Sequence, residues 1–270
     1  MASFKPYRVS SNGKFKLSKV DPGVTPFVQG SEDQQREQLT ELAIELDKLQ
    51  NRLHAEGRRK VLLVLQGMDT SGKDGTIRWV FSRTSPLGVR VIPFKVPSEL
   101  ERAHDFLWRC HAVVPGNGQL MIWNRSHYED VLVPVVEELI DKKETQRRYR
   151  QINDFERLLV ETGTTVIKCM LHISTDEQRT RLQERIDTPG KQWKFSRGDL
   201  AVRQKWDAYQ SAYEKALAAT STGHAPWHVI PANSKVHPNL MIAQLLVRTL
   251  KDMKLHLPPA DPALKGLVVR

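Results

Sequence analysis

Residues 60–76, KVLLVLQGMDTSGKDGT, decide the fold. They begin with a continuous apolar run at residues 61–65, which is too short for a helix and is typical of a strand buried on both faces of a parallel sheet. A glycine-rich turn follows the run, and a helical stretch over about residues 72–83 follows the turn. The segment therefore predicts a buried strand, a tight turn and a helix in direct succession.

The rest of the chain repeats this alternation. Further strands are expected at residues 89–94, 119–123, 164–173 and 227–231. Helices are expected at residues 32–56, 98–111, 127–140, 145–162, 176–186, 199–219 and 238–254. This order predicts an α/β protein with a parallel five-stranded sheet and helices on both faces. Ligands of such sheets bind outside the carboxyl ends of the strands, which makes three segments candidate sites: the turn at 67–72, residues 124–125 and the polar loop at 187–199.

The chain divides into three parts. Residues 1–30 are basic, carry scattered Gly and Pro, and are expected to form an arm on the surface. Residues 31–254 are expected to form one domain, including a mobile lid at about residues 180–200. Residues 255–270 are expected to form a loose C-terminal tail.

Composition excludes several classes of protein. The 270 residues include 41 Lys and Arg against 31 Asp and Glu, a net charge of +10, so we expect a polyanionic partner such as nucleic acid, a phosphate chain or anionic lipid. Two cysteines, Cys110 and Cys169, exclude a disulfide scaffold and suit a reducing cytoplasm. No apolar run approaches membrane length and the first twenty residues lack an apolar core, so a membrane-spanning or secreted protein is not expected.

The turn after the first strand, residues 67–74, matches the phosphate-loop pattern G-x-x-x-x-G-K-[ST] at every position but the last. Its glycines allow successive backbone N–H groups to face one anion, the helix N-terminus adds partial positive charge, and Lys73 adds a full charge for a transferring phosphoryl group. The alternative is a glycine-rich turn without a ligand. The candidate phosphate- and nucleotide-binding residues of this phosphate loop are Met68, Thr70, Ser71, Gly72, Asp74 and Gly75.

Two acids make this phosphate loop unusual. Asp74 stands where a Ser or Thr hydroxyl would bind Mg²⁺, and Asp69 lies inside the loop. A carboxylate among phosphates needs a cation, so Asp69 is the expected ligand of Mg²⁺, with Mn²⁺ as a substitute, and Asp74 is expected to cap the helix. Asn124, at the end of the third strand, offers no charge to a metal. Arg125 is expected to point into the same cleft and stabilise transferring phosphate, with a surface ion pair as its alternative.

Positive charges also gather near the polar loop. Arg181 and Arg185 lie four apart on one helix face, and Lys191 and Lys194 follow on a segment with Pro and Gly. Beside a phosphate loop, this pattern predicts a basic helical lid that closes over phosphates and excludes water. A solvated charged loop is the alternative.

Taken together, these motifs resemble the polyphosphate kinase 2 family. The resemblance spans roughly residues 30–253 and rests on segments in family order, among them GMDTSGKDGT (67–76), WNRSHYEDVL (123–132), INDFERLL (152–159), PGKQWKFSRGDL (189–200), KWDAYQSAYE (205–214) and TSTGHAPWHVIPANSK (220–235). An acid inside the loop and a residue other than Ser or Thr after its lysine are normal in that family.

The resemblance implies a P-loop kinase-like fold and Mg²⁺-dependent phosphoryl transfer between inorganic polyphosphate and a purine nucleotide. Asp69 and Lys73 would be the acid and lysine of the loop, and Asn124–Arg125 a Walker B-like pair. The lid residues would be Arg181, Arg185, Lys191 and Lys194. The loop and NRSHYED look closest to the subgroup that accepts both nucleoside mono- and diphosphates, and Glu129 is a candidate for acceptor choice, with a surface salt bridge as its alternative.

Two other functions compete with this one. An ATP-dependent nucleoside monophosphate kinase would explain the loop and lid but not the loop acid or the excess charge. A nucleic-acid-binding ATPase would explain the charge, but no recognition motif accompanies it, so we expect no specific nucleic acid partner. We also expect a homo-oligomer, because the arm and the amphipathic helix at 32–56 offer surfaces for self-association, although these segments could instead cap the core.

Overall fold

The computed structural model describes residues 3–11 and 13–269, and it is built around a parallel sheet of five strands. The strands are β1 (Lys60–Gln66), β2 (Val89–Pro93), β3 (Leu120–Asn124), β4 (Thr164–His172) and β5 (Trp227–Pro231). Their order across the sheet is β2-β3-β1-β4-β5, and every neighbouring pair is parallel. The predicted five-stranded parallel sheet is confirmed.

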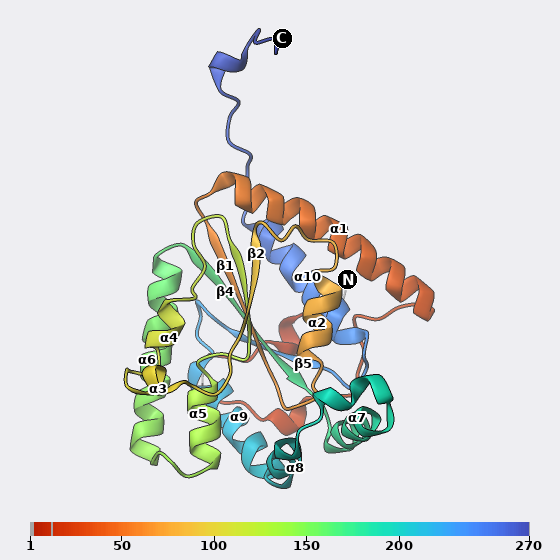
Figure 1. Ribbon diagram of the computed structural model, residues 1–270, viewed down its shortest axis with the longest axis vertical. Helices are drawn as coiled ribbons and strands as arrows, with labels where there is room; N and C mark the ends of the chain where they lie inside the picture. Colours follow the sequence, from red (N-terminus) through yellow and green to blue (C-terminus); the bar gives the residue numbers. More distant parts are fainter. Residues whose placement is uncertain (1–2, 12, 270) are drawn as a thin grey trace.

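Helices cover both faces of this sheet (Figure 1). The longer ones are α1 (Glu32–Glu56), α2 (Lys73–Val80), α5 (Glu129–Val136), α6 (Lys142–Glu161), α7 (Thr175–Asp187), α8 (Arg197–Gln204), α9 (Trp206–Thr220) and α10 (His237–Asp252). The short ones are α3 (Glu99–Arg102) and α4 (Trp108–His111), with 3-10 turns η1 (Lys5–Tyr7), η2 (Leu17–Lys19), η3 (Pro189–Lys194) and η4 (Pro262–Leu264).

Strand β1 shows why the sheet needs helices on both sides. Leu62 and Val64 pack with residues of α5, α6 and α9, whereas Val61, Leu63 and Leu65 pack with residues of α1, α2 and α10. All five side chains are fully buried. Because successive strand residues point to opposite faces, a run that is apolar at every position requires cover on both.

The strand order brings three loops together at one edge of the sheet. β1 lies between β3 and β4, with Leu65 opposite Asn124 and Gln66 opposite Met170. In parallel strands the carboxyl ends meet at the same edge, so the turns after β1, β3 and β4 are neighbours. Helices α7 and α8 lie at this edge, opposite the end from which the C-terminal tail extends (Figure 1).

Two expected long helices are broken in the structure. The helix expected at 98–111 begins with the predicted capping box of Ser98 and Glu101 but ends at Arg102. Asp105 then accepts a hydrogen bond from the Leu107 backbone N–H at 2.9 Å, a local bond that competes with the helix and starts a new turn. The helix expected at 199–219 is α8 and α9, which meet at a bend centred on Lys205.

Part of the basic N-terminal arm belongs to the core. Val9, Leu17 and Phe27 are buried, and the Val9 N–H donates to the Trp227 carbonyl at 2.9 Å. The arm thereby covers part of the outer edge of β5. By contrast, the tail from residue 256 to 269 is exposed.

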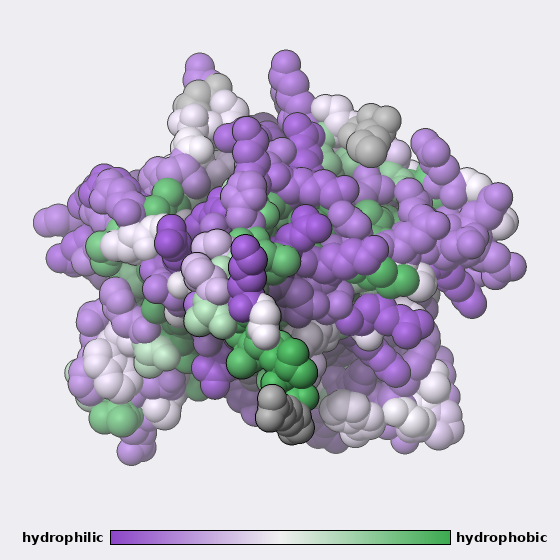
Figure 2. Space-filling view, turned by 90° about the horizontal axis from the view of Figure 1, so that it is seen from above, coloured by the Kyte–Doolittle hydropathy of each residue, from purple (hydrophilic) through white to green (hydrophobic). Residues whose placement is uncertain are grey.

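The surface is mostly hydrophilic, as the high content of charged residues leads one to expect. The face seen in Figure 2 is mostly hydrophilic, and its hydrophobic residues form small separate groups. Among the described residues, none of the helices has the length and apolar composition needed to cross a bilayer.

A charged pair lies in the core behind the carboxyl ends of the strands. Lys168 of β4 donates to the Glu156 carboxylate at 2.6 Å, to the Tyr128 hydroxyl at 2.9 Å and to the Thr220 carbonyl at 2.7 Å. Both charged side chains are essentially inaccessible to solvent. Burial opposes the charge on Glu156, but Lys168 and His127 outweigh burial and lower the pKa of this carboxyl. The network joins β4, α6, α9 and the segment that leads into α5.

Candidate active site

The phosphate loop follows β1 and has a conformation that its glycines permit. Gly67 has φ +148° and Gly72 has φ +102°, and a Cβ on Gly67 would lie 2.5 Å from the Leu171 carbonyl oxygen. Thr70 also has a positive φ, +68°, which is uncommon for a β-branched residue. Such a conformation costs about 1–3 kcal/mol and persists only where its surroundings hold it. The loop is therefore a strained turn that other contacts must maintain.

Lys73 lies inside this loop, as predicted. Its ammonium donates to the Gly67 carbonyl at 2.7 Å, the Met68 carbonyl at 3.1 Å and the Ser71 hydroxyl at 3.3 Å. Only 8% of the residue is exposed. Burial lowers the pKa of the Lys73 ammonium to about 8, and the nearby Arg125 acts in the same direction. The loop thus holds a cation whose charge a bound anion would stabilise.

Asp69 and Arg125 form an ion pair across the mouth of the loop. Arg125 Nη2 lies 2.5 Å from Asp69 Oδ1, and the Arg125 side chain remains 42% exposed. Arg125 has φ +62° directly after β3, and its backbone N–H donates to the Leu65 carbonyl, so the end of the neighbouring strand fixes its position. Burial opposes the charge on Arg125, but Glu129 and Asp69 outweigh it and raise the pKa of the guanidinium.

Glu129 and Tyr213 complete the charged centre. Glu129 is the first residue of α5, and its burial raises the pKa of the carboxyl despite the nearby Arg125 and Lys73. Tyr213 of α9 is buried close to the charges of Glu129, Arg125 and Asp69, and burial raises the pKa of its phenol well above the usual value. Glu129 therefore lies among the charged side chains of the loop and not in a surface salt bridge.

The expected role of Asp74 as a helix cap is wrong. Gly72 is the N-cap residue of α2, no side chain caps this helix, and Asp74 lies in its first turn. The Asp74 carboxylate instead accepts a hydrogen bond from Asn124 Nδ2 at 2.7 Å. The reason is the strand order, because β3 lies next to β1 and its last residue reaches the start of the helix that follows β1. Asn124 therefore orients the Asp74 carboxylate in the first turn of α2.

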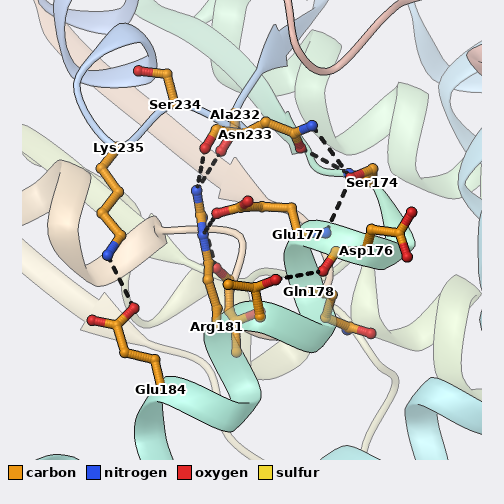
Figure 3. A network of polar contacts seen from close by, with 12 residues as sticks. Ser174, Asp176, Glu177, Gln178, Arg181, Glu184, Ala232, Asn233, Ser234 and Lys235 are labelled. Carbon is orange, nitrogen blue, oxygen red and sulfur yellow. Dashed lines mark hydrogen bonds and ion pairs between the residues drawn. The ribbon is translucent and has the colours of Figure 1, made fainter. Parts of the chain in front are cut away.

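Arg181 is turned away from the other expected lid cations and towards the phosphate loop. Figure 3 shows its guanidinium between Glu177 and the backbone of Ala232 and Asn233. Nη1 donates to the Thr70 carbonyl at 2.9 Å, and Nη2 donates to the Ala232 carbonyl at 2.7 Å. The side chain is 10% exposed. Its contacts are with protein groups on three separate segments.

The remaining lid cations have partners inside the lid. Arg185 pairs with Asp199 at 3.2 Å, Lys191 pairs with Glu184 at 2.5 Å, and Lys194 lies 5.1 Å from the ring centroid of Trp193. The structure therefore brings Asp69, Lys73, Arg125 and Glu129 together at the loop, whereas Lys191 and Lys194 are exposed. Their binding of phosphate stays a prediction.

Glu184 is held by two cations. Besides Lys191 it pairs with Lys235 at 3.0 Å, so one carboxylate bridges the lid and the segment between β5 and α10 (Figure 3). Hydrogen bonds from Lys191 and Lys235 lower the pKa of the Glu184 carboxyl to about 2.

A cleft of about 520 Å³ lies on the other side of α5. Arg109 and Asp130 pair at 3.0 Å in its wall, and Asp130 directly follows Glu129 in the chain. Further cations and a ring line the same cleft: Arg102, Arg147, Arg148 and Phe106. Its volume lies within the range that is typical of small-molecule binding sites.

Sequence reasoning missed several groups at this site. Tyr213, Asp199 and Gln178 each face the loop or its partners, but all three lie far from the loop in the sequence. No local pattern distinguishes Tyr213 from the other apolar residues on the buried face of α9. Asp199 had a sequence signal, because it is an acid among the basic residues of the lid.

Comparison with known proteins identifies the family. The model of the family described as Polyphosphate kinase 2 (PPK2) matches residues 29–258. An AMP/ADP-polyphosphate phosphotransferase from Meiothermus ruber is 51% identical, with 98% of this chain and 99% of that protein covered. An ADP-polyphosphate phosphotransferase from Rhodopseudomonas palustris is 41% identical, with 96% and 93% covered.

Comparison with solved structures points to the same family. The crystal structure of polyphosphate kinase 2 from Arthrobacter aurescens superposes with a TM-score of 0.92 at 44% identity, covering 97% of this chain and 94% of that one. A putative polyphosphate kinase 2 from Pseudomonas aeruginosa superposes with a TM-score of 0.81 at 32% identity, covering 88% and 50%. The resemblance inferred from the sequence motifs is confirmed. This chain belongs to the polyphosphate kinase 2 family.

Proposed function

We propose that this protein transfers phosphoryl groups between inorganic polyphosphate and a purine nucleotide, with both AMP and ADP as acceptors. The observation that carries the proposal is the cluster of Lys73, Asp69 and Arg125 at the phosphate loop, in a chain 51% identical to an AMP/ADP-polyphosphate phosphotransferase. The net charge of +10 supports a polyanionic donor.

The geometry supports catalysis by electrostatic stabilisation. Phosphoryl transfer asks little covalent chemistry of a protein, since charge spreads over the oxygens of the transferring group and must be neutralised there. Lys73 lies within the loop and Arg125 faces it from the end of β3, so the two cations approach one phosphoryl group from different strands. Arg125 is released from Asp69 if a phosphate replaces the carboxylate as its partner.

The residues present fit Mg²⁺. The donors near the loop are oxygens: the carboxylates of Asp69, Glu129 and Asp74, and a buried Thr70 hydroxyl without a hydrogen-bond partner. Within the described part of the chain, no group of three or more His, Cys, Asp or Glu side chains is placed to hold a metal ion. Mg²⁺ binds through one or two carboxylates and takes its other ligands from phosphates and water, which suits this arrangement. Asp69 is the proposed ligand, and the ion would neutralise phosphate charge.

The cleft beside α5 is the proposed position of the acceptor nucleotide. It borders Asp130, whose neighbour in the chain, Glu129, lies near Arg125 and Lys73. Arginines in its wall offer bidentate donors for phosphate and ribose oxygens. Glu129 is the proposed contributor to acceptor choice, because it directly precedes Asp130 in the chain and lies near the charged side chains of the loop.

The first test measures products directly. The protein is incubated with polyphosphate, Mg²⁺ and one of AMP, ADP, GMP or GDP, and nucleotides are separated and quantified. We expect AMP to give ADP and ADP to give ATP. Turnover with ATP as donor to AMP but none with polyphosphate would support the nucleoside monophosphate kinase instead. ATP hydrolysis stimulated by DNA or RNA would support the nucleic-acid ATPase.

The second test assigns Asp69. Asp69→Asn is almost isosteric, so the fold is retained while the metal loses its anionic ligand. We expect turnover to fall by about 100-fold or more and to recover in part at high Mg²⁺ or Mn²⁺. Asp154→Asn, on the exposed side of α6, is the control and keeps the activity. A loss that depends on pH and is not rescued by metal would assign a general base, and unchanged activity and Mg²⁺ dependence would reject both roles.

A further inference from the structure

Arg181 uses almost all its donors on protein groups. Its four recorded hydrogen bonds run to Glu177 Oε1 at 2.6 Å, the Thr70 carbonyl at 2.9 Å, the Ala232 carbonyl at 2.7 Å and the Asn233 carbonyl at 3.0 Å. A guanidinium has five N–H donors, so only one is left. Bidentate binding of a phosphate would require existing bonds to break.

The bond to Thr70 acts where the phosphate loop is strained. Thr70 has φ +68°, a conformation that a threonine keeps only when its surroundings hold it. A trans peptide directs its C=O and N–H to opposite sides. Holding the Thr70 oxygen towards α7 therefore turns the Ser71 N–H the other way, where it closes the loop on the Met68 carbonyl at 3.1 Å.

A second residue of α7 acts on the preceding peptide. Gln178 Nε2 donates to the Asp69 carbonyl at 3.3 Å. Gln178 and Arg181 lie three residues apart, so they share one face of the helix. In the peptide between Asp69 and Thr70 the C=O and N–H also point to opposite sides, so holding the Asp69 oxygen towards α7 turns the Thr70 N–H towards the inside of the loop.

The other end of Arg181 is anchored to the segment after β5. That segment is itself fixed, because Asn233 Oδ1 accepts from the Ser174 backbone N–H at 2.9 Å at the start of α7 (Figure 3). Arg181 thus spans the phosphate loop, α7 and the β5–α10 connection, and its position follows from the sheet and not from the lid.

We infer that Arg181 is a positioning residue, which fixes the peptide planes of the phosphate loop from outside and does not bind the donor phosphate. The inference rests on the proposed function, because its assay is turnover of polyphosphate. If that function is wrong, the wild-type protein is inactive with polyphosphate. If only the inference is wrong, the wild type is active and the variants below behave differently.

The test is Arg181→Lys, which retains the charge but cannot span three segments. We expect kcat to fall by about 10- to 100-fold, as small displacements of reacting groups do. KM for polyphosphate should change less than about threefold, and the slope of log KM against log salt should stay that of the wild type. Arg179→Gln is the matched control on the same helix, because Arg179 is exposed and pairs with Asp176 at 3.6 Å, and it should leave kcat unchanged.

A readout independent of stability is the coupling with Thr70. Thr70→Gly removes the strain that Arg181 holds, since glycine adopts positive φ freely. The loss of kcat caused by Arg181→Lys should therefore be at least about threefold smaller in the Thr70→Gly background. If Arg181→Lys does not fold, Gln178→Met tests the neighbouring contact, with an expected kcat loss of about 3- to 10-fold at unchanged KM.

Three results would overturn the inference. A raised KM with a shallower salt slope in Arg181→Lys would mean that Arg181 contacts the donor. An unchanged kcat, in Arg181→Lys or in the substitute variant Gln178→Met, would mean that α7 does not set the loop. Equal losses in the Thr70 and Thr70→Gly backgrounds would mean that the effect does not pass through Thr70.

Discussion

Removing one member of the buried pair Lys168–Glu156 should destabilise the protein more than removing both. Lys168→Met leaves the Glu156 carboxylate in a site with no access to solvent, and Glu156→Leu leaves the ammonium there. Each single change should lower the free energy of unfolding by about 3–5 kcal/mol, since a buried charge loses its oppositely charged partner, although Glu156 keeps the Tyr128 hydroxyl at 2.8 Å and His127 Nε2 at 3.3 Å beside it. That is a large part of the roughly 5–15 kcal/mol that stabilises a typical domain.

The double variant removes both charges, so the remaining cost comes from neutral groups. The Tyr128 hydroxyl and the Thr220 carbonyl lose the ammonium that they contact at 2.9 and 2.7 Å. Unsatisfied buried polar groups of this kind cost about 1–3 kcal/mol. We therefore expect the double variant to be more stable than either single one, with a coupling energy of at least about 3 kcal/mol.

Urea unfolding followed by circular dichroism, at constant protein concentration, measures the four free energies of the cycle. The exposed pair of Arg157 and Asp154, 3.0 Å apart on α6, is the control, and its coupling should stay below about 1 kcal/mol. The reasoning is refuted if the losses for Lys168→Met and Glu156→Leu add within about 0.5 kcal/mol.

The remaining predictions concern activity. Lys73→Met should lower kcat by about 100-fold or more, because it removes a preorganised charge, and near-normal turnover from polyphosphate would exclude the loop as the reaction centre. Burial lowers the pKa of Lys73 to about 8, so the free enzyme loses this cation as the pH rises, and log kcat/KM should fall above about pH 8. Bound phosphate stabilises the cation, so the decrease of kcat at alkaline pH should occur at a higher pH. A decrease that persists in Lys73→Arg would assign it to another group. Lys191→Ala with Lys194→Ala should raise KM for polyphosphate and reduce its salt dependence, and an unchanged KM with a lower melting temperature would make the lid a purely structural loop.

The central part of the fold could be predicted because its signals are local. The continuous apolar run at residues 61–65, the glycine-rich turn and the capping box at Ser98 depend only on neighbouring residues. The strand order could not be predicted, because nothing in the sequence of β2 states that it pairs with β3 at the edge of the sheet. The break at Asp105 was missed because one side-chain hydrogen bond outweighed a periodic pattern.

The site residues that follow from local sequence patterns could likewise be predicted, whereas those that depend on contacts made by folding could not. Lys73 was placed correctly because its spacing from two glycines is a local property of the loop. Asp74 was assigned a cap, but its true partner, Asn124, becomes a neighbour only through the pairing of β1 with β3. Arg181 follows the periodicity of the lid cations, and only the folded chain distinguishes it by turning it towards Thr70.

Glu184 acts as a built-in counterion that competes with any other anion for the cations of the lid. Its carboxylate occupies Lys191 and Lys235, so a phosphate chain must exchange with it to reach either cation. A monovalent anion has little advantage over a tethered carboxylate, whereas a chain with many charges gains from several contacts at once. Because the pKa of the Glu184 carboxyl is about 2, this group stays ionised at neutral pH and does not release the two lysines by protonation. We therefore expect chain length and ionic strength, and not pH, to govern the exchange of a phosphate chain for Glu184.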